Sequence, residues 1–126
     1  MRYLILLALF LPLSLKAETF LCVGETGAGV ENTGAGGFKS EIYDVSNQKF
    51  ILTSENGSWL LKKHGQNRPV FDHCNSEYLC MEKDGYSGVF IRNNQDAVFV
   101  YSIMKSSGED FRKSVLLTVK GLCSKL

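Results

Sequence analysis

The chain has 126 residues, of which 14 are basic and 13 are acidic, and 44% are hydrophobic. This length suits one domain with a modest core. The near-neutral charge argues against a nucleic-acid-binding protein, which would present a basic face, and no run of like charges indicates a membrane-surface patch.

The N-terminal residues have the pattern of a secretory signal peptide. Arg2 gives a basic start, an apolar run extends from Tyr3 to Leu15, and Ala17 is a small residue at the expected cleavage site. The apolar run is too short for a membrane span, which needs about 20 residues. We therefore expect a signal peptide at 1–17 and a single domain at 18–126. The mature protein would lie in the periplasm or outside the cell, without stable membrane insertion after cleavage.

A glycine-rich segment follows a short predicted first strand, Thr19 to Val23. Residues 24–37 read GETGAGVENTGAGG. Because glycine loses more backbone freedom on folding than other residues, we expect this segment to be a mobile loop. A phosphate-binding loop is not indicated, since the segment lacks both the Gly-Lys-Ser/Thr ending of the Walker pattern and a following helix.

From Phe38 onward, short apolar runs alternate with turn residues, a pattern typical of an all-β sandwich or barrel. Asn56-Gly57 is the strongest hairpin signal, because both central residues of a type I′ turn need positive φ. We predict a small antiparallel sandwich or up-and-down barrel of about eight short strands. After the first strand, the predicted strands are Lys39–Val45, Lys49–Thr53, Ser58–Lys62, Val70–Cys74, Tyr78–Glu82, Tyr86–Arg92, Ala97–Ile103 and Ser114–Cys123.

Alternation along these strands assigns one face to the core. A helix over Asp110–Leu122 is the alternative for the last region, but its β-branched residues favour a strand. The aromatic residues could line a ligand pocket if the sheet closes, but in so small a domain we expect them to form the core. The expected core positions include Trp59, Leu61, Phe90, Phe99, Tyr101, Ile103, Leu117, Val119 and Cys123.

The four cysteines are an even number in a chain that we expect to be exported, so they predict two disulfides. We favour Cys74–Cys80 together with Cys22–Cys123, which would join the first strand to the last. The central pair would lie about 20 Å apart in one extended strand, so it requires a chain reversal, for which Asn75-Ser76 is the turn-prone site. The alternative joins Cys22 to one central cysteine and Cys123 to the other.

Asp72-His73-Cys74, with Cys80 and His64 nearby, could suggest a metal site or a reactive thiol. The spacing fits zinc poorly, and a reduced thiolate is not expected in an oxidising compartment. We therefore interpret these cysteines as structural and predict no metal and no cofactor. The C-terminal Ser124-Lys125-Leu126 matches a peroxisomal address, which conflicts with export, and we treat it as coincidental.

No catalytic signature accompanies this scaffold, so an enzyme is the less favoured interpretation. We expect a binding or inhibitory protein of the cell envelope or extracellular space, whose partner is another protein. Its contact surfaces would be the glycine-rich loop and the loop that contains Asn75, Ser76, Glu77 and Tyr78, since loops on a rigid scaffold commonly carry function. In size, cysteines and short strands the chain resembles the small periplasmic inhibitors of c-type lysozyme; this resemblance covers architecture and carries over no residue. The alternative is a small-ligand carrier or hydrolase that uses a barrel interior.

Overall fold

The structure is a computed structural model that describes residues 17–33, 37–71, 73–83, 88–105 and 115–126; the expected signal peptide, apart from Ala17, lies outside them. The all-β prediction is confirmed, since these residues form nine antiparallel strands and no helix. No helix in these parts of the chain could therefore cross a membrane. The strands are β1 (Thr19–Asn32), β2 (Phe38–Tyr43), β3 (Lys49–Glu55), β4 (Ser58–Lys63), β5 (His73–Ser76), β6 (Leu79–Met81), β7 (Gly88–Arg92), β8 (Val98–Lys105) and β9 (Val115–Lys125).

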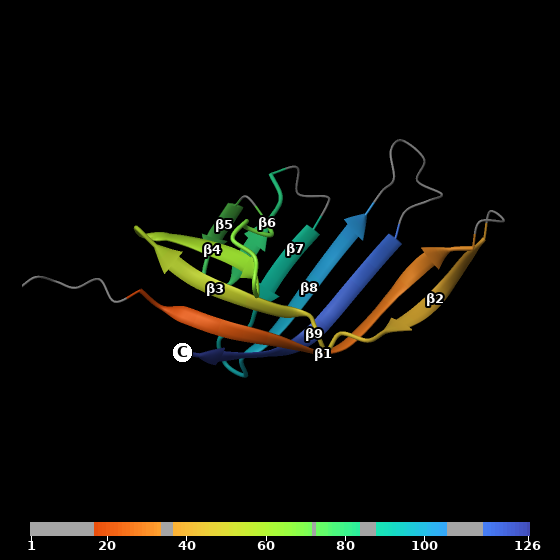
Figure 1. Cartoon of the computed structure of the whole chain (residues 1–126), viewed down its shortest axis with the longest axis horizontal. Helices are drawn as coiled ribbons and strands as arrows, with labels where there is room; N and C mark the ends of the chain where they lie inside the picture. The colour runs from red at the N-terminus through yellow and green to blue at the C-terminus, as the bar shows by residue number, and fades with distance from the viewer. Residues whose placement is uncertain (1–16, 34–36, 72, 84–87, 106–114) are drawn as a thin grey trace, which may run out of the picture.

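The long strand β1 organises a single curved sheet in the order β4-β3-β1-β9-β8-β7-β6-β5 (Figure 1). One edge of β1 pairs with β9 along most of its length. Its other edge pairs first with β3 and then, beyond residue 26, with β2. A register shift between Gly24 and Thr26 separates the two halves. β2 lies off the main order of strands and pairs with β1 alone among the described strands.

The two ends of the sheet, β4 and β5, come together and nearly close the barrel. The segment before β5 lies against β4, where Val70 N donates to Leu61 O at 2.7 Å and Lys62 pairs with Pro69. The predicted strand Val70–Cys74 is therefore wrong in its bounds, since the paired strand starts only at His73. The rest of that segment serves to close the barrel wall.

Aromatic side chains fill the barrel interior. The Phe50 ring centroid lies 4.6 Å from that of Tyr101 and 5.9 Å from that of Phe99, and Phe90 stacks on Phe99 at 5.3 Å. Phe50 belongs to β3, Phe90 to β7, and both Phe99 and Tyr101 to β8, so the rings hold separate parts of the barrel wall together. Fully buried side chains in the core are Cys22, Phe50, Leu52, Leu61, Cys80, Phe90, Phe99 and Val119.

The predicted glycine-rich loop is wrong for its first nine residues, because β1 continues to Asn32. The composition predicted a loop, but glycine is required at these positions because neighbouring atoms leave no space for a Cβ. A Cβ on Gly27 would overlap the Val45 side chain, and one on Gly29 would overlap the carbonyl oxygen of Leu116. Close strand approach explains glycine here without requiring a loop.

Gly121 in β9 lets the strand pass close to β1. A Cβ there would overlap the carbonyl oxygen of Val23 and lie 2.7 Å from a ring carbon of Phe99. We expect Gly121→Ala to lower the free energy of unfolding by about 2 kcal/mol, because the core cannot absorb the added methyl group. In urea denaturation the control Gly37→Ala should change stability little, because the nearest group that its Cβ would meet among the described residues is the Thr33 hydroxyl at 3.3 Å. Equal effects of the two substitutions would contradict this account.

The turn between β5 and β6 lies two residues later than predicted. Asn75 belongs to β5, and Ser76 pairs with Leu79, so the chain reverses at Glu77-Tyr78. The Ser76 hydroxyl accepts a hydrogen bond from Tyr78 N at 3.1 Å, which is the local stabilisation that serine provides at the start of a turn. By contrast, the predicted type I′ turn at Asn56-Gly57 is confirmed by φ values of 52° and 79°.

Tyr43 and Glu31 tie β2 to β1 across their hairpin, because the phenol donates to Glu31 Oε1 at 2.6 Å. This hydrogen bond is the largest influence that raises the pKa of Tyr43 from 10.0 to about 12. The folded state favours the neutral phenol, so its stabilisation is complete below pH 10 and is lost as pH rises toward 12. In an NMR titration of ring-labelled tyrosine, Glu31→Gln should move the Tyr43 transition back toward 10. A wild-type transition already at 10 would rule out this interaction.

Candidate functional site

Arg92 lies at the end of β7, where its side chain is only 5% exposed. Its guanidinium carbon lies 4.0 Å from the ring centroid of Phe20 and 5.0 Å from that of Tyr78. Aromatic faces attract a cation and exclude water from it. Arg92 is therefore held between the first strand and the β5–β6 turn.

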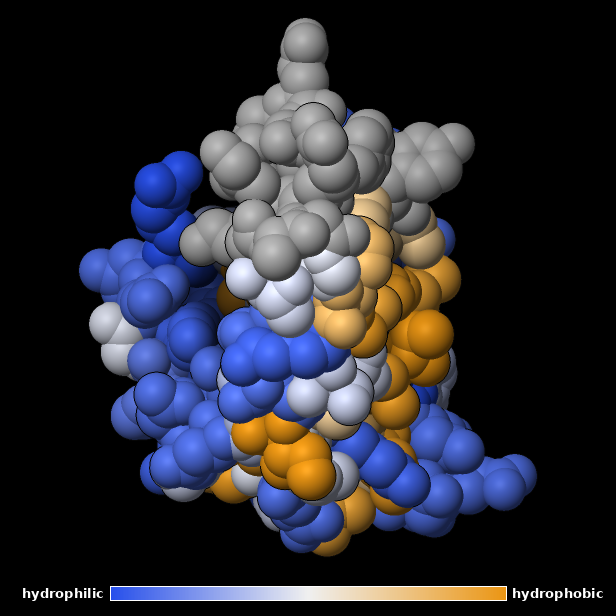
Figure 2. All heavy atoms as spheres, turned by 90° about the vertical axis from the view of Figure 1, so that its right-hand side faces the viewer, coloured by the Kyte–Doolittle hydropathy of each residue, from blue (hydrophilic) through white to orange (hydrophobic). Residues whose placement is uncertain are grey.

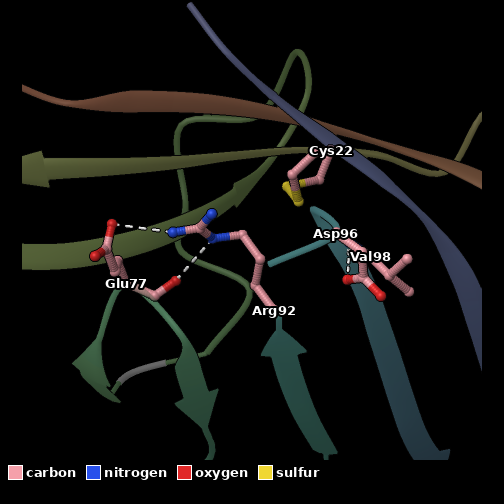
Figure 3. The surroundings of a disulfide bond; sticks show 6 residues. Cys22, Glu77, Arg92, Asp96 and Val98 are labelled. Carbon is pink, nitrogen blue, oxygen red and sulfur yellow. Dashed lines mark hydrogen bonds and ion pairs between the residues drawn. A yellow bond between two sulfur atoms is a disulfide. The ribbon is translucent and has the colours of Figure 1, made fainter. Parts of the chain in front are cut away.

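Glu77 supplies the counter-charge for Arg92 (Figure 3). Arg92 Nη2 lies 3.0 Å from Glu77 Oε2, and Arg92 Nε donates to Glu77 O at 3.2 Å. The backbone N–H of Arg92 donates to Tyr78 O at 2.9 Å. Both backbone carbonyls of the turn are thus bound to one residue, which fixes the turn on the barrel. Hydrogen bonding to the Glu77 side chain also raises the pKa of Tyr78.

The Cys22–Cys123 disulfide lies on the other side of Arg92, close to the β7–β8 connection (Figure 3). In that connection the Asp96 carboxylate accepts a hydrogen bond from Val98 N at 3.1 Å. Ala97 O accepts one from Cys123 N at 2.8 Å. The connection is therefore attached to the disulfide-linked strands and forms a fixed rim.

These elements surround an open pocket of about 390 Å³ at one end of the barrel. Its charges pair with one another: Arg92 with Glu77, and Lys125 Nζ with Glu18 Oε1 at 2.6 Å. The second pair is exposed, so solvent weakens it and a ligand could compete with it. The pocket lining comprises Glu18, Phe20, Glu77, Arg92, Asn94, Ala97, Cys123 and Lys125.

The structure brings only part of the predicted contact loop to this pocket. Glu77 and Tyr78 contact Arg92, whereas Ser76 stabilises the turn and Asn75 is exposed on β5. Sequence reasoning missed Arg92. A signal for it was present, because Arg92 shares the core-facing parity of Phe90.

The four cysteines form two disulfides, Cys22–Cys123 and Cys74–Cys80, which are the pairs favoured from the sequence. The pairing leaves no cysteine thiol as a nucleophile or metal ligand. Within the described ranges, no group of three or more His, Cys, Asp or Glu side chains could hold a metal ion. The disulfides indicate an oxidising environment.

A second candidate surface lies on the outside of the sheet. Val30 pairs with Leu116, and Leu116 pairs with Met104, so these side chains form a row across β1, β9 and β8. On β2, Phe38 and Ile42 face the same side, and they are 62% and 87% exposed. We call these five residues the outer apolar surface. Figure 2 shows hydrophobic side chains gathered along one flank of the molecule.

Comparison with known proteins found no matching family model, no similar curated protein and no similar solved structure.

Proposed function

We propose that the protein is a binding or inhibitory protein of the periplasm or extracellular space, and that it binds a partner protein through the outer apolar surface. The observation that carries this proposal is the contiguous exposure of Val30, Phe38, Ile42, Met104 and Leu116. Contiguous apolar patches on soluble domains commonly mark interaction sites. The two disulfides support an oxidising compartment.

The chemistry of this surface favours a partner with an apolar patch and a polar rim. The Leu116 side chain is 44% exposed in the middle of the row, so a partner seated there would remove apolar area from water. Next to the row, the hydroxyls of Ser102 and Thr118 lie 3.1 Å apart across β8 and β9. Hydroxyls at the border can exchange this bond for bonds to the partner, as in the rims of protein interfaces.

The test is selective recovery of a partner from the periplasm or culture medium of the native source. The protein would be immobilised as wild type, as Leu116→Glu and as the control Gln66→Glu. Both variants add one negative charge at an exposed position, but Gln66 lies in the β4–β5 connection. We expect Leu116→Glu to lose a partner that wild type and Gln66→Glu retain, with circular dichroism spectra unchanged. Recovery of the same proteins by all three would overturn the proposal.

The barrel-end pocket supports a second candidate function, the binding of a small polar ligand. Its volume and its paired charges suit a molecule that carries both an acidic and a basic group. Such a molecule would replace Glu18 as the partner of Lys125. Native mass spectrometry should then detect a bound molecule in wild-type protein and lose it in Lys125→Met. An unliganded wild-type mass after purification from the native source would contradict this candidate.

A further inference from the structure

Among the strands that the structure describes, β2 has one edge without a partner. One side of β2 pairs with β1, and no other strand in the described parts of the chain pairs with the opposite side. A free edge with exposed apolar side chains is a template for another strand, and proteins usually block such edges. On β2 neither proline nor a bulge does so, and Phe38 and Ile42 are both exposed. Its two charged residues, Lys39 and Glu41, are of opposite sign, so they repel a second strand only when like charges meet.

The pairing of β2 with β1 determines which backbone groups remain unused. Thr33 N donates to Gly37 O at 3.0 Å, so these opposite residues are a hydrogen-bonded pair. Hydrogen-bonded and non-hydrogen-bonded pairs alternate along an antiparallel ladder. The residues of β2 whose N–H and C=O groups point to β1 are therefore Lys39, Glu41 and Tyr43. The N–H and C=O groups that point to the free edge therefore belong to Phe38, Ser40 and Ile42.

We propose that a second copy of this chain occupies that edge, with the two β2 strands antiparallel and the two-fold axis at Ser40. Phe38 then lies opposite Ile42 of the second copy, and Lys39 lies opposite Glu41 of the second copy. The free N–H and C=O groups of each Ser40 meet their equivalents. The edge is complementary to itself in hydrogen bonds, in charge and in apolar contacts. This inference goes beyond the proposed function, because it names no outside partner.

Neighbouring registers of the same pairing are unfavourable. A shift of the axis to Lys39 places the two lysines opposite one another, and a shift to Glu41 does the same for the two glutamates. Like charges directly opposite destabilise an antiparallel pair. An axis midway between Lys39 and Ser40 would pair Lys39 with Ser40 of the second copy, and the side chains of these two residues lie on different faces of the sheet. Only the axis at Ser40 brings each lysine to a glutamate.

Lys39 and Glu41 do not lose their existing partners in this arrangement. Within one copy, Lys39 Nζ lies 3.1 Å from Glu41 Oε2 and 4.0 Å from Glu31 Oε2. The carboxylate of the second copy joins the same cluster from the open side, where Lys39 is 53% exposed. The pairing therefore leaves no charge buried without a counter-charge.

The dimer also extends the outer face of the sheet. An axis perpendicular to the sheet keeps the outer faces of both copies on the same side. The two rows formed by Val30, Leu116 and Met104 would then flank a central cluster of Phe38 and Ile42 from both copies. A dimer presents one continuous apolar surface in place of two separate ones.

Charge reversal tests this register directly. Sedimentation equilibrium of the purified exported protein should show a monomer–dimer equilibrium. Lys39→Glu and Glu41→Lys should each weaken dimerisation roughly tenfold, because symmetry places two like-charged contacts in each dimer. An equimolar mixture of the two variants should regain the dimer, since one chain then carries only acids at these positions and the other only bases.

Ser40→Pro provides a test through the backbone. The Ser40 N–H points to the free edge, so proline should remove a hydrogen bond of the dimer while leaving the pairing with β1 intact. Circular dichroism spectra should match those of wild type. A wild-type protein that sediments as a monomer up to high concentration would overturn the proposal. So would a dimer that the charge reversals leave unchanged, or a mixture of the two variants that stays monomeric.

Discussion

Removal of the Cys22–Cys123 disulfide should lower the free energy of unfolding by about 4 to 5 kcal/mol, roughly twice the loss from removal of Cys74–Cys80. The first disulfide joins residues 101 positions apart, and the second joins residues 6 positions apart. A crosslink that closes a longer loop removes more freedom from the unfolded chain. The difference in loop length is therefore expected to decide the difference in stability.

The measurement is urea denaturation of Cys22→Ala/Cys123→Ala and Cys74→Ala/Cys80→Ala. The two double variants are matched, because each disulfide links directly opposite residues of paired strands and each includes a fully buried cysteine. Loss of side-chain packing should then be similar in both. Equal destabilisation by the two variants would show that restriction of the unfolded chain does not determine how much each disulfide contributes to stability.

The location of the long crosslink has a consequence for the barrel-end pocket. Cys123 and Phe20 both line the pocket, and the Glu18–Lys125 pair joins the residue before β1 to the last residue of β9. Without the crosslink, the ends of these two strands would be held mainly by ladder hydrogen bonds. Such ends open more readily than the core. In the protein without this crosslink, the backbone amides around the pocket should therefore lose protection from hydrogen exchange before those at the centre of the barrel.

Local patterns in the sequence predicted the strands well because their cause is local. Alternation in β8 and β9 placed Phe99, Tyr101 and Val119 in the core, where they are buried. Asn56-Gly57 specified its hairpin because these two residues tolerate positive φ. Both signals depend on backbone geometry within a few residues, and tertiary contacts reinforce them.

The failures of sequence reasoning have non-local causes. Glycines at 27 and 29 indicated a loop by composition, but their positions in β1 depend on the close approach of Val45 and Leu116, which lie far along the chain. The outer apolar surface was missed for a different reason. Leu116 shares the polar parity of Thr118 and Lys120, so an alternation rule treats it as a solvated position and gives it no role.

The candidate pocket was not predicted from the sequence; Glu77 and Tyr78 were chosen as exposed loop residues, and of these two Glu77 lines the pocket. Their partner, Arg92, enters the core-facing side of β7, where an apolar residue is the usual expectation. An arginine at such a position implies a nearby carboxylate. The sequence offers many acids, and only the fold brings Glu77 to it. The type of partner was therefore predictable, but its identity was not.

Glu77→Gln should destabilise the protein by about 3 kcal/mol, because it leaves the guanidinium of Arg92 buried without a counter-charge. The amide keeps the size of the glutamate and can still accept a hydrogen bond, so the loss reports charge. Glu77 itself is 24% exposed, which places the expected value at the lower end for broken buried pairs. The effect should appear in urea denaturation as a lower midpoint with an unchanged slope.

The control is Glu55→Gln, which breaks the pair between Glu55 and Lys62 at 3.2 Å. Those side chains are 51% and 26% exposed, so the expected loss is below about 1 kcal/mol. The double variant Arg92→Met/Glu77→Gln should be more stable than Glu77→Gln alone, since it removes the buried charge that the single variant leaves unpaired. If the double variant is instead the less stable of the two, then Arg92 acts through its contacts with Phe20 and the β5–β6 turn rather than through its charge.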